Sequence, residues 1–358
     1  MDAIYQKLSR VLDTLPSGFP TTDSGIEITI LKKIFTPEEA DLFCDLKTTP
    51  ETAEQVAERT GRPRDGLEDK LIEMWKRGEI AASNLGSAKA FKMMPWILGI
   101  FEFQNKRMDK EFAKMCEEYS MHWGPQFITY GPPLMQVIPI EKEIPVKQEA
   151  LTYHQVSNLI ENSKSFTVSE CICKKEQGLL DNPCTKPTEV CMAMNSEPGY
   201  YDNHPWAGRV ITKEEAYEVL HKAEEAGLVH MTSNLESGHG YICNCCGCCC
   251  GLLRAAKMGI PNVVNSFYFA RIDPDLCTAC GICAEERCQV NAVEPGEEAY
   301  RITKEKCIGC GLCVSTCPTE AIQLVRKQPE EIVVPVKDEE AWFDERARQR
   351  GVDYHMYR

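Results

Sequence analysis

Two short cysteine runs in the last quarter of the chain have the spacing that iron–sulfur chemistry needs. Each run reads C-x2-C-x2-C and is followed by one more cysteine. A [4Fe–4S] cube binds four thiolates, and a tight loop can supply three of them while a more distant cysteine supplies the fourth. Where two such runs occur together, the trailing cysteine of each serves the cluster of the other. The pattern therefore predicts one cluster on Cys277, Cys280, Cys283 and Cys317, and a second on Cys307, Cys310, Cys313 and Cys288.

These runs resemble those of the bacterial-type 2[4Fe–4S] ferredoxins over residues 270–326. The resemblance implies a ferredoxin-like domain that carries two clusters. A zinc ribbon and a secreted disulfide framework are the competing interpretations, but two tandem three-cysteine runs fit the spacing of neither. The chain departs from the family at one loop, where four residues instead of three separate Cys283 from Cys288, and Gln289 replaces the usual proline.

A second cysteine set lies upstream and could hold one further metal centre. Four thiols fall within 21 residues, at Cys171, Cys173, Cys184 and Cys191. In an extended C-x-C segment, alternate side chains point the same way, so the first two could reach one metal. Tetrahedral zinc is the alternative occupant of a four-cysteine site. The ferredoxin-like neighbours favour iron–sulfur here.

The third set is a run of six thiols within eight residues: Cys243, Cys245, Cys246, Cys248, Cys249 and Cys250. Three allocations are open. One cluster takes four of them, two clusters share them with the second set, or the run holds an unusual cluster or substrate-reactive thiolates. Gly247 and Gly251 suit a loop whose backbone approaches a cluster closely. We expect the ten central cysteines to hold two clusters, which makes about four in the chain.

Composition places these thiols in a reducing compartment. Eighteen of the twenty cysteines follow residue 170, no secretory signal pattern is visible, and no apolar stretch is long enough to span a membrane. A cytoplasmic protein is therefore expected, in which cysteine spacing indicates metal or redox chemistry. Cys44 and Cys116 stand alone on helical patterns and are interpreted as small buried apolar residues. No glycine-rich dinucleotide fingerprint or Walker loop is present, so we expect neither flavin nor nucleotide.

The elements that must position these cysteines indicate an α+β chain. An amphipathic helix opens it, with a short strand expected at 26–30. Helices are predicted from 36 to about 47, over 52–59 and over 64–77, with a hairpin to 93. This order resembles a winged helix over 36–95. The predicted domains are a helical region at 1–123 that includes this module, a proline-rich arm at 124–150, a cysteine-rich α/β domain at 151–265, the ferredoxin-like domain at 266–326, and a charged tail at 327–358. The tail is either a solvated end or a segment that wraps a partner, and we favour the second.

Charge argues against nucleic acid as a partner. The net charge is −14, and residues 36–82 hold twelve acids against seven Lys and Arg. Affinity for nucleic acid depends on neutralising phosphates with basic side chains, so this module is interpreted as a protein-docking or structural element. An acidic surface instead favours a basic protein partner.

Clusters in series without another cofactor indicate electron transfer. The leading hypothesis is an electron-transfer subunit of an anaerobic oxidoreductase, with a protein donor and a catalytic subunit as partners. Two alternatives stay open: a reductase with a special cluster at 243–250, and a redox-sensing winged-helix regulator. His204 and His239 could be ligands or proton donors, although structural roles are the simpler interpretation.

Overall fold

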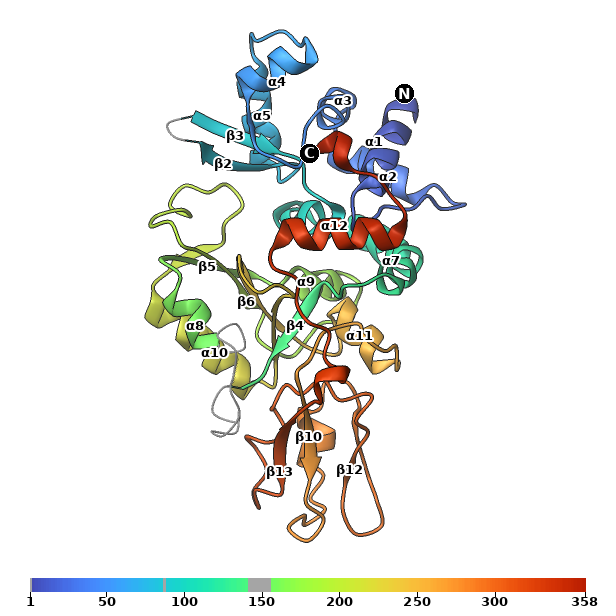
Figure 1. Ribbon diagram of the computed structural model, residues 1–358, viewed down its shortest axis with the longest axis vertical. Helices are drawn as coiled ribbons and strands as arrows, with labels where there is room; N and C mark the ends of the chain where they lie inside the picture. Colours follow the sequence, from blue (N-terminus) through green and yellow to red (C-terminus); the bar gives the residue numbers. More distant parts are fainter. Residues whose placement is uncertain (1, 86–87, 141–155) are drawn as a thin grey trace. The chain divides into compact units, whose positions relative to one another are not determined.

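The computed structural model describes residues 2–85, 88–140 and 156–358, which form two compact units. The first unit contains Met1–Gly131, Leu179–Asp181 and Phe343–Arg358, and the second contains Pro132–Gly178 and Asn182–Trp342 (Figure 1). The eighteen clustered cysteines all belong to the second unit. The last part of the predicted proline-rich arm, 141–150, lies outside the described residues, as does the start of the predicted cysteine-rich domain.

Two helices open the first unit, and the second of them corrects a sequence prediction. Helix α1, Asp2–Thr14, buries the face that contains Leu8 and Leu12, as its periodicity predicts. The strand expected at 26–30 is instead the start of helix α2, Ile26–Ile34. Alternating isoleucines suggested a strand, but Ile30, Leu31 and Ile34 form a buried helical face, and α2 packs against α1 and α7 (Lys110–Thr129). Tertiary packing outweighs the local alternation here.

The next elements follow the order predicted for residues 36–95. They are α3 (Pro37–Phe43), β1 (Glu51–Thr52), α4 (Ala53–Thr60), α5 (Leu67–Lys76), β2 (Ala81–Leu85) and β3 (Ala88–Lys92). The three strands form one antiparallel sheet in the order β1-β3-β2. Thr36 and Thr52 cap α3 and α4 through capping boxes, and Gly61 ends α4 in the left-handed conformation with φ 74°. Helix α3 ends earlier than predicted, at Phe43.

Helix α7, Lys110–Thr129, continues into the segment that was predicted to be an extended arm. Pro125 lies inside the helix, although it removes one backbone donor. The turn after it is held by packing, because Phe127 is buried and its ring stacks on Trp123 with centroids 4.4 Å apart. The prediction of an arm from residue 124 is therefore wrong for this stretch.

The last part of the charged tail, Phe343–Arg358, belongs to the first unit and packs inside it, which corrects the prediction of a partner-wrapping end. Helix α12, Glu339–Arg350, carries Arg346 with 1% of its surface exposed. The Arg346 guanidinium donates to the carbonyl oxygens of Pro16 (3.1 Å), Tyr130 (2.6 Å) and Phe127, and lies over the Phe127 ring. A sequence rich in charge concealed this contact, since the charged group is satisfied inside the unit by backbone acceptors.

A six-stranded antiparallel sheet forms the centre of the second unit, in the order β4-β8-β9-β6-β5-β7. Its strands are β4 (Met135–Ile138), β5 (Ser165–Glu170), β6 (Glu189–Asn195), β7 (Arg209–Ile211), β8 (Val229–Ser233) and β9 (Tyr241–Cys245). Helices α8 (Val156–Glu161) and α10 (Lys213–Glu225) pack on it through one apolar core. Strand β4 lies between Pro133 and Pro139, so part of the predicted arm is an edge strand, a position that tolerates flanking prolines.

The remaining elements of the second unit carry or follow the cysteines (Figure 1). Helix α9, Ile172–Leu179, begins beside the second cysteine set, and α11, Gly251–Lys257, follows the third. In the ferredoxin-like part, β10 (Tyr268–Ile272) pairs with β13 (Ile322–Arg326), and β11 (Val293–Glu294) pairs with β12 (Arg301–Ile302). The two cysteine runs lie in the loops between these strands.

Replacing Arg346 tests how much its buried hydrogen bonds contribute to the stability of the first unit. Arg346→Ala should lower the free energy of unfolding of this unit by about 3 kcal/mol, because three buried carbonyl oxygens lose their donor. Denaturant unfolding followed by tryptophan fluorescence measures the change. Arg348→Ala is the control, because Arg348 is exposed and pairs with Glu345 on the same helix. Equal stability of the two variants would contradict the assigned role of Arg346.

Candidate functional site

The first predicted ligand set gathers around one small cavity of the ferredoxin-like part. Cys277, Cys280, Cys283 and Cys317 line it together with apolar neighbours such as Ile272. Burial raises the pKa of the Cys317 thiol, but hydrogen bonds from Thr319, Ala321 and Ile322 outweigh burial and leave the pKa below its ordinary value. The trailing cysteine of the second run therefore lies with the first run, as its spacing predicts.

The second predicted set, Cys288, Cys307, Cys310 and Cys313, gathers in the same way. Burial raises the pKa of Cys310 to about 12, and the neighbouring Cys307 and Cys288 contribute to this rise. Backbone N–H groups are aimed at two of the sulfurs: Ala292 donates to Cys288 Sγ at 3.1 Å and Ala270 to Cys307 Sγ at 3.3 Å. Crowded, buried thiols with N–H donors aimed at sulfur fit a [4Fe–4S] group, whose iron compensates the thiolate charge.

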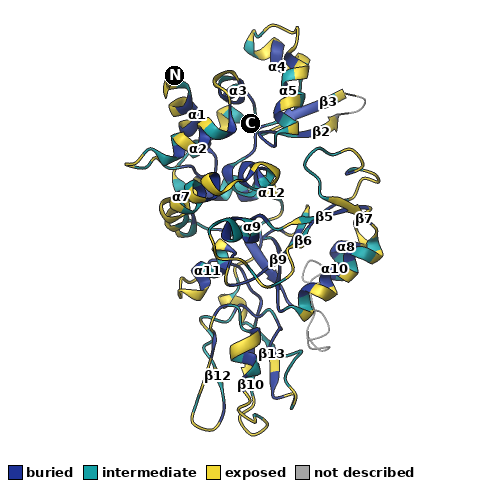
Figure 2. Cartoon of the chain, turned by 180° about the vertical axis from the view of Figure 1, so that it is seen from behind, coloured by how far each residue is buried: buried dark blue, intermediate teal, exposed yellow. Residues whose placement is uncertain are grey.

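The two cysteine loops differ in exposure. In the first, Cys280 is exposed and the nearby Leu276 is 50% exposed. Figure 2 shows mostly intermediate and exposed colours on the loops around β10 and β12, in contrast to the buried strand β9 of the central sheet. The second loop packs into the rest of the unit, where Ile140 N–H donates to Cys310 O at 3.1 Å and Ser266 Oγ donates to Ile308 O at 2.8 Å. One ligand set therefore lies near solvent, and the other faces the central sheet.

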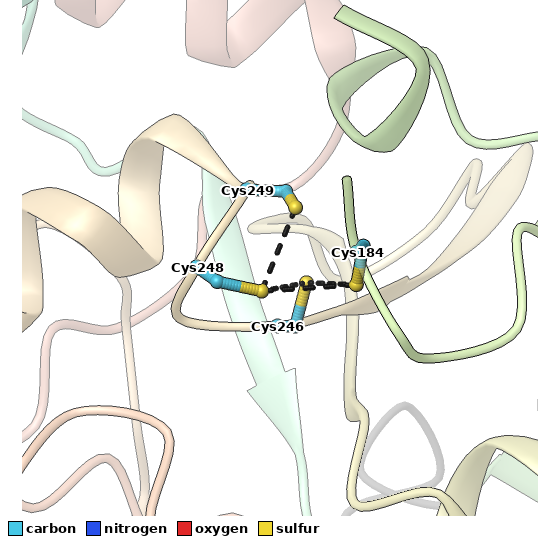
Figure 3. Close-up of side chains that lie close together, drawn as sticks. All are labelled: Cys184, Cys246, Cys248 and Cys249. Carbon is cyan, nitrogen blue, oxygen red and sulfur yellow. Dashed lines mark hydrogen bonds between the residues drawn. The ribbon is translucent and has the colours of Figure 1, made fainter. Parts of the chain in front are cut away.

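Four of the ten central cysteines form a compact tetrad (Figure 3), made of Cys184, Cys246, Cys248 and Cys249. The Sγ atom of Cys184 lies 3.8 Å from that of Cys246 and 3.7 Å from that of Cys248. Cys248 Sγ lies 3.2 Å from Cys246 Sγ and 3.5 Å from Cys249 Sγ. Cys184 was expected to join Cys171, Cys173 and Cys191 in one centre. The structure instead places the Cys184 sulfur among those of the turn that follows β9, because the loop after α9 carries it there, while Cys171 and Cys173 pack against the same apolar core.

The other six central cysteines form a second group, the hexad. Its members are Cys171, Cys173, Cys191, Cys243, Cys245 and Cys250. Cys243 and Cys245 are two residues apart on β9, so their side chains point to the same face of the strand. The register of β6 on β9 brings Cys191 opposite Cys243. Hydrogen bonds from Cys191 and Cys245 hold the pKa of Cys243 well below its ordinary value. Four of the ten central cysteines thus form one compact group, and the other six are linked as a series of neighbouring thiols, two of which, Cys171 and Cys173, also pack against the core that holds Cys246 and Cys249. This arrangement favours the allocation in which the run is shared between two centres.

The C-x-C segment is not extended as predicted. Helix α9 begins directly after Cys171, whose carbonyl accepts from Lys175 N–H at 3.0 Å, and Cys173 lies in its first turn. The two thiols meet nevertheless, and a hydrogen bond from Cys173 lowers the pKa of Cys171. Ile172 is buried, so the packing of this side chain in the core determines where the helix starts. The C-x-C spacing, which is also compatible with a strand, does not determine the local structure.

Two residues, Arg287 and Gln289, connect the ferredoxin-like part to the central part of the second unit. This contact, called the joint below, was not predicted from the sequence. Arg287, which is 9% exposed, donates to the carbonyl oxygens of Leu312 (3.2 Å), Glu225 (2.9 Å) and Glu224 (2.8 Å). Gly247 N–H donates to Gln289 Oε1 at 3.1 Å, so the thiol run touches the loop that carries Cys288. The four-residue spacer and the Gln in place of Pro were the signal that marked this loop as unusual.

The two candidate histidines have contacts of a structural kind. His239 lies near the hydroxyls of Thr232 and Ser233, at 3.4 and 3.3 Å, and burial lowers its pKa to about 4, which keeps it neutral. His204 packs edge-on against Trp206, with ring centroids 4.1 Å apart. The proposed ligand or proton-donor roles for the pair gain no support from these contacts.

A third histidine, His230, was not singled out from the sequence and lies closer to the cysteines. It is 2% exposed on β8, and its Nδ1 lies 2.5 Å from Oδ1 of Asn244. Asn244 stands between Cys243 and Cys245 and donates to Val190 O at 2.7 Å. This buried pair orients β9, so that its two cysteines point to the opposite face of the strand.

Comparisons with known proteins match the ferredoxin-like part. A family model described as a 4Fe-4S binding domain matches residues 300–323. Ferredoxin-1 of Rhodobacter capsulatus is 39% identical over 56 residues, which is 14% of this chain and 85% of that protein. Ferredoxin 7Fe of Hydrogenibacillus schlegelii is 37% identical over 59 residues, 16% of this chain and 74% of that protein.

A longer relative matches over a similar number of residues. It belongs to the ion-translocating oxidoreductase complex of Methanosarcina acetivorans, is 42% identical over 48 residues, and is covered by this chain over 18% of its length. Within the described residues, no helix has the length and apolar character needed to cross a membrane.

A methyl group at the joint tests its packing. A Cβ at position 247 would lie 1.9 Å from the carbonyl oxygen of Gln289, so Gly247→Ala must push two backbones apart. We expect a loss of about 1–3 kcal/mol, typical of overpacking, and earlier bleaching of the iron–sulfur absorbance on heating. Gly251→Ala is the matched control, since a Cβ there meets nothing within 4 Å. Identical bleaching curves for the two variants would refute the contact.

Proposed function

Because the chain belongs to the 4Fe–4S ferredoxin family through its C-terminal part, we propose that it is an electron-transfer subunit of a cytoplasmic anaerobic oxidoreductase complex. It would carry low-potential electrons between a protein donor and a catalytic subunit. The observation that supports this proposal most directly is the presence of two ferredoxin-like cysteine sets and ten further thiols within one compact unit. The partial similarity to a component of an ion-translocating oxidoreductase complex agrees with a role inside a larger assembly.

The residues that would hold the two ferredoxin clusters are the sets given above, Cys277, Cys280, Cys283 and Cys317, and Cys288, Cys307, Cys310 and Cys313. When bound, a [4Fe–4S] group supplies a one-electron carrier whose potential depends on burial and on hydrogen bonds to sulfur. Ala270 and Ala292 supply such hydrogen bonds to Cys307 and Cys288. The second set is therefore tuned by backbone donors as well as by burial.

The exposed loop around Cys280 is the side on which we place the external partner. Asp275, Glu285 and Glu320 are exposed on the loops that carry this ligand set. Acidic side chains around an exposed redox site steer a basic partner toward it and raise the rate of encounter. The buried loop at 307–313 faces the central sheet instead, which gives the relay an outer and an inner end.

We infer that the winged-helix-like module at 36–95 docks a protein and does not bind DNA. Six of its seven basic residues between 36 and 82 already pair with acids of the same unit, among them Arg62 with Asp41 and Asp45, and Lys70 with Glu38. On α5, Glu68, Asp69 and Glu73 are exposed. Phosphate contacts need free Lys and Arg side chains, so the regulator hypothesis loses its electrostatic basis.

A reductase with a special centre is the second candidate, and the hexad favours it. Six thiols are two more than one cube binds, which leaves a pair that could take part in substrate chemistry. This candidate predicts that adding the substrate changes the EPR signal of the central unit. A pure electron carrier shows no such change.

Removing one ligand of the outer set tests the relay. Cys280→Ala should lose about four iron and four sulfide per chain, lose one reduced-state EPR signal, and accept electrons from reduced viologen more slowly. Iron and sulfide assays and EPR on anaerobically purified protein measure this. Cys116→Ala removes a buried thiol of the first unit and serves as the control. Unchanged iron content and reduction rate in Cys280→Ala would exclude an outer cluster at this loop.

A further inference from the structure

The tetrad is spaced for a single metal ion. We propose that Cys184, Cys246, Cys248 and Cys249 bind one zinc ion as a tetrathiolate site and do not hold a fourth cluster. Zinc binds four thiolates tetrahedrally at about 2.3 Å, so the sulfurs of such a site lie about 3.8 Å apart. The Sγ separations from Cys184, 3.8 and 3.7 Å, match this edge length, and those from Cys248 to Cys249 and to Cys246, 3.5 and 3.2 Å, are shorter still.

A cube demands a wider arrangement than this. Each thiolate of a [4Fe–4S] group binds a different iron, so the four sulfurs lie around a body of eight atoms and not around one. The tetrad brings its four sulfurs within 4.8 Å of one another, and no other group of three or more potential ligands in the described residues is as compact. The two ferredoxin sets and the hexad lie wholly within those residues. The tetrad is thus more compact than the cysteine sets of the same chain that are assigned to clusters.

The local backbone also suits a closed structural site. Three ligands come from one turn, in which the N–H groups of Cys249 and Cys250 approach Cys246 O at 3.4 and 3.2 Å. Cys184 completes the set from a loop 62 residues away. Cys246 and Cys249 pack in an apolar core with Val190 and Leu228, which keeps the buried side of the site dry. Structural zinc sites have four protein ligands and no open position.

A buried cation lies beside the tetrad. Four thiolates and one Zn²⁺ carry a net charge of −2, which is costly to bury without compensation. Lys174 is 2% exposed, interacts electrostatically with Cys246, and donates to Pro187 O at 2.5 Å in the loop that carries Cys184. Its ammonium group supplies part of the missing positive charge and ties the same loop to α9.

Zinc has no redox chemistry, so the ion would act as a clamp. It would join the loop of Cys184 to the turn at 246–249 and thereby hold Gly247 against Gln289, next to the inner ferredoxin set. The hexad is then left as the one central centre with thiols for a cluster. The full chain would carry about 12 iron and 12 sulfide in three cubes, together with one zinc.

Metal analysis of the anaerobically purified full-length chain tests the assignment. We expect about one zinc per chain with about 12 iron and 12 sulfide. Cys248→Ala should lose the zinc and keep iron and sulfide, while Cys280→Ala should lose about four iron and keep the zinc. Protein produced with cobalt should show the visible absorption of a tetrahedral cobalt tetrathiolate, which Cys248→Ala abolishes.

Three results would overturn the proposal: about 16 iron with no zinc, loss of about four iron and four sulfide in Cys248→Ala, or zinc that survives this substitution. If Cys248→Ala does not fold, the zinc content and cobalt spectrum of the unaltered chain decide the question. Failure of the electron-transfer proposal is distinguishable, because it would show as missing iron in the ferredoxin sets whatever the zinc content.

Discussion

The cost of ionising buried, crowded thiols is the constraint on which this structure depends. Burial and neighbouring thiols raise the pKa of Cys310 and Cys313, so these groups resist ionisation unless positive charge enters among them. A metal centre supplies that charge, and its binding free energy becomes folding free energy for the loops that carry the ligands. The ferredoxin-like part has two short pairs of strands and a small apolar core. Its cysteine loops are therefore ordered by metal binding more than by apolar packing.

Two routes bring the sulfurs together. In the ferredoxin-like part, tight loops supply three ligands each, and a left-handed glycine such as Gly281, with φ 81°, permits the turn. In the central sheet, strand register does the work, since Cys191 faces Cys243 across β6 and β9. The first route is local and leaves a readable spacing. The second depends on strands more than forty residues apart in the sequence and leaves none.

This difference explains what the sequence could predict. The two ferredoxin sets follow from spacing, and the helix starts predicted at 36 and 52 are confirmed by the caps Thr36 and Thr52. The exchange of Cys184 out of its expected group could not be foreseen, because it depends on where a loop of the folded chain returns. Pro125 misled for the same reason: local propensity argued against a helix that buried Phe127 stabilises.

The contacts of Arg287 and Gln289 explain why the spacer after Cys283 departs from the ferredoxin pattern. The four-residue spacer includes Arg287, whose guanidinium donates to the carbonyl oxygens of Glu224 and Glu225 at the C-terminal end of α10. A proline at 289 has no side-chain oxygen with which to accept from Gly247 N–H, as Gln289 does. Arg287 and Gln289 therefore fix the ferredoxin-like part within the second unit, next to the turn that carries Cys246, Cys248 and Cys249.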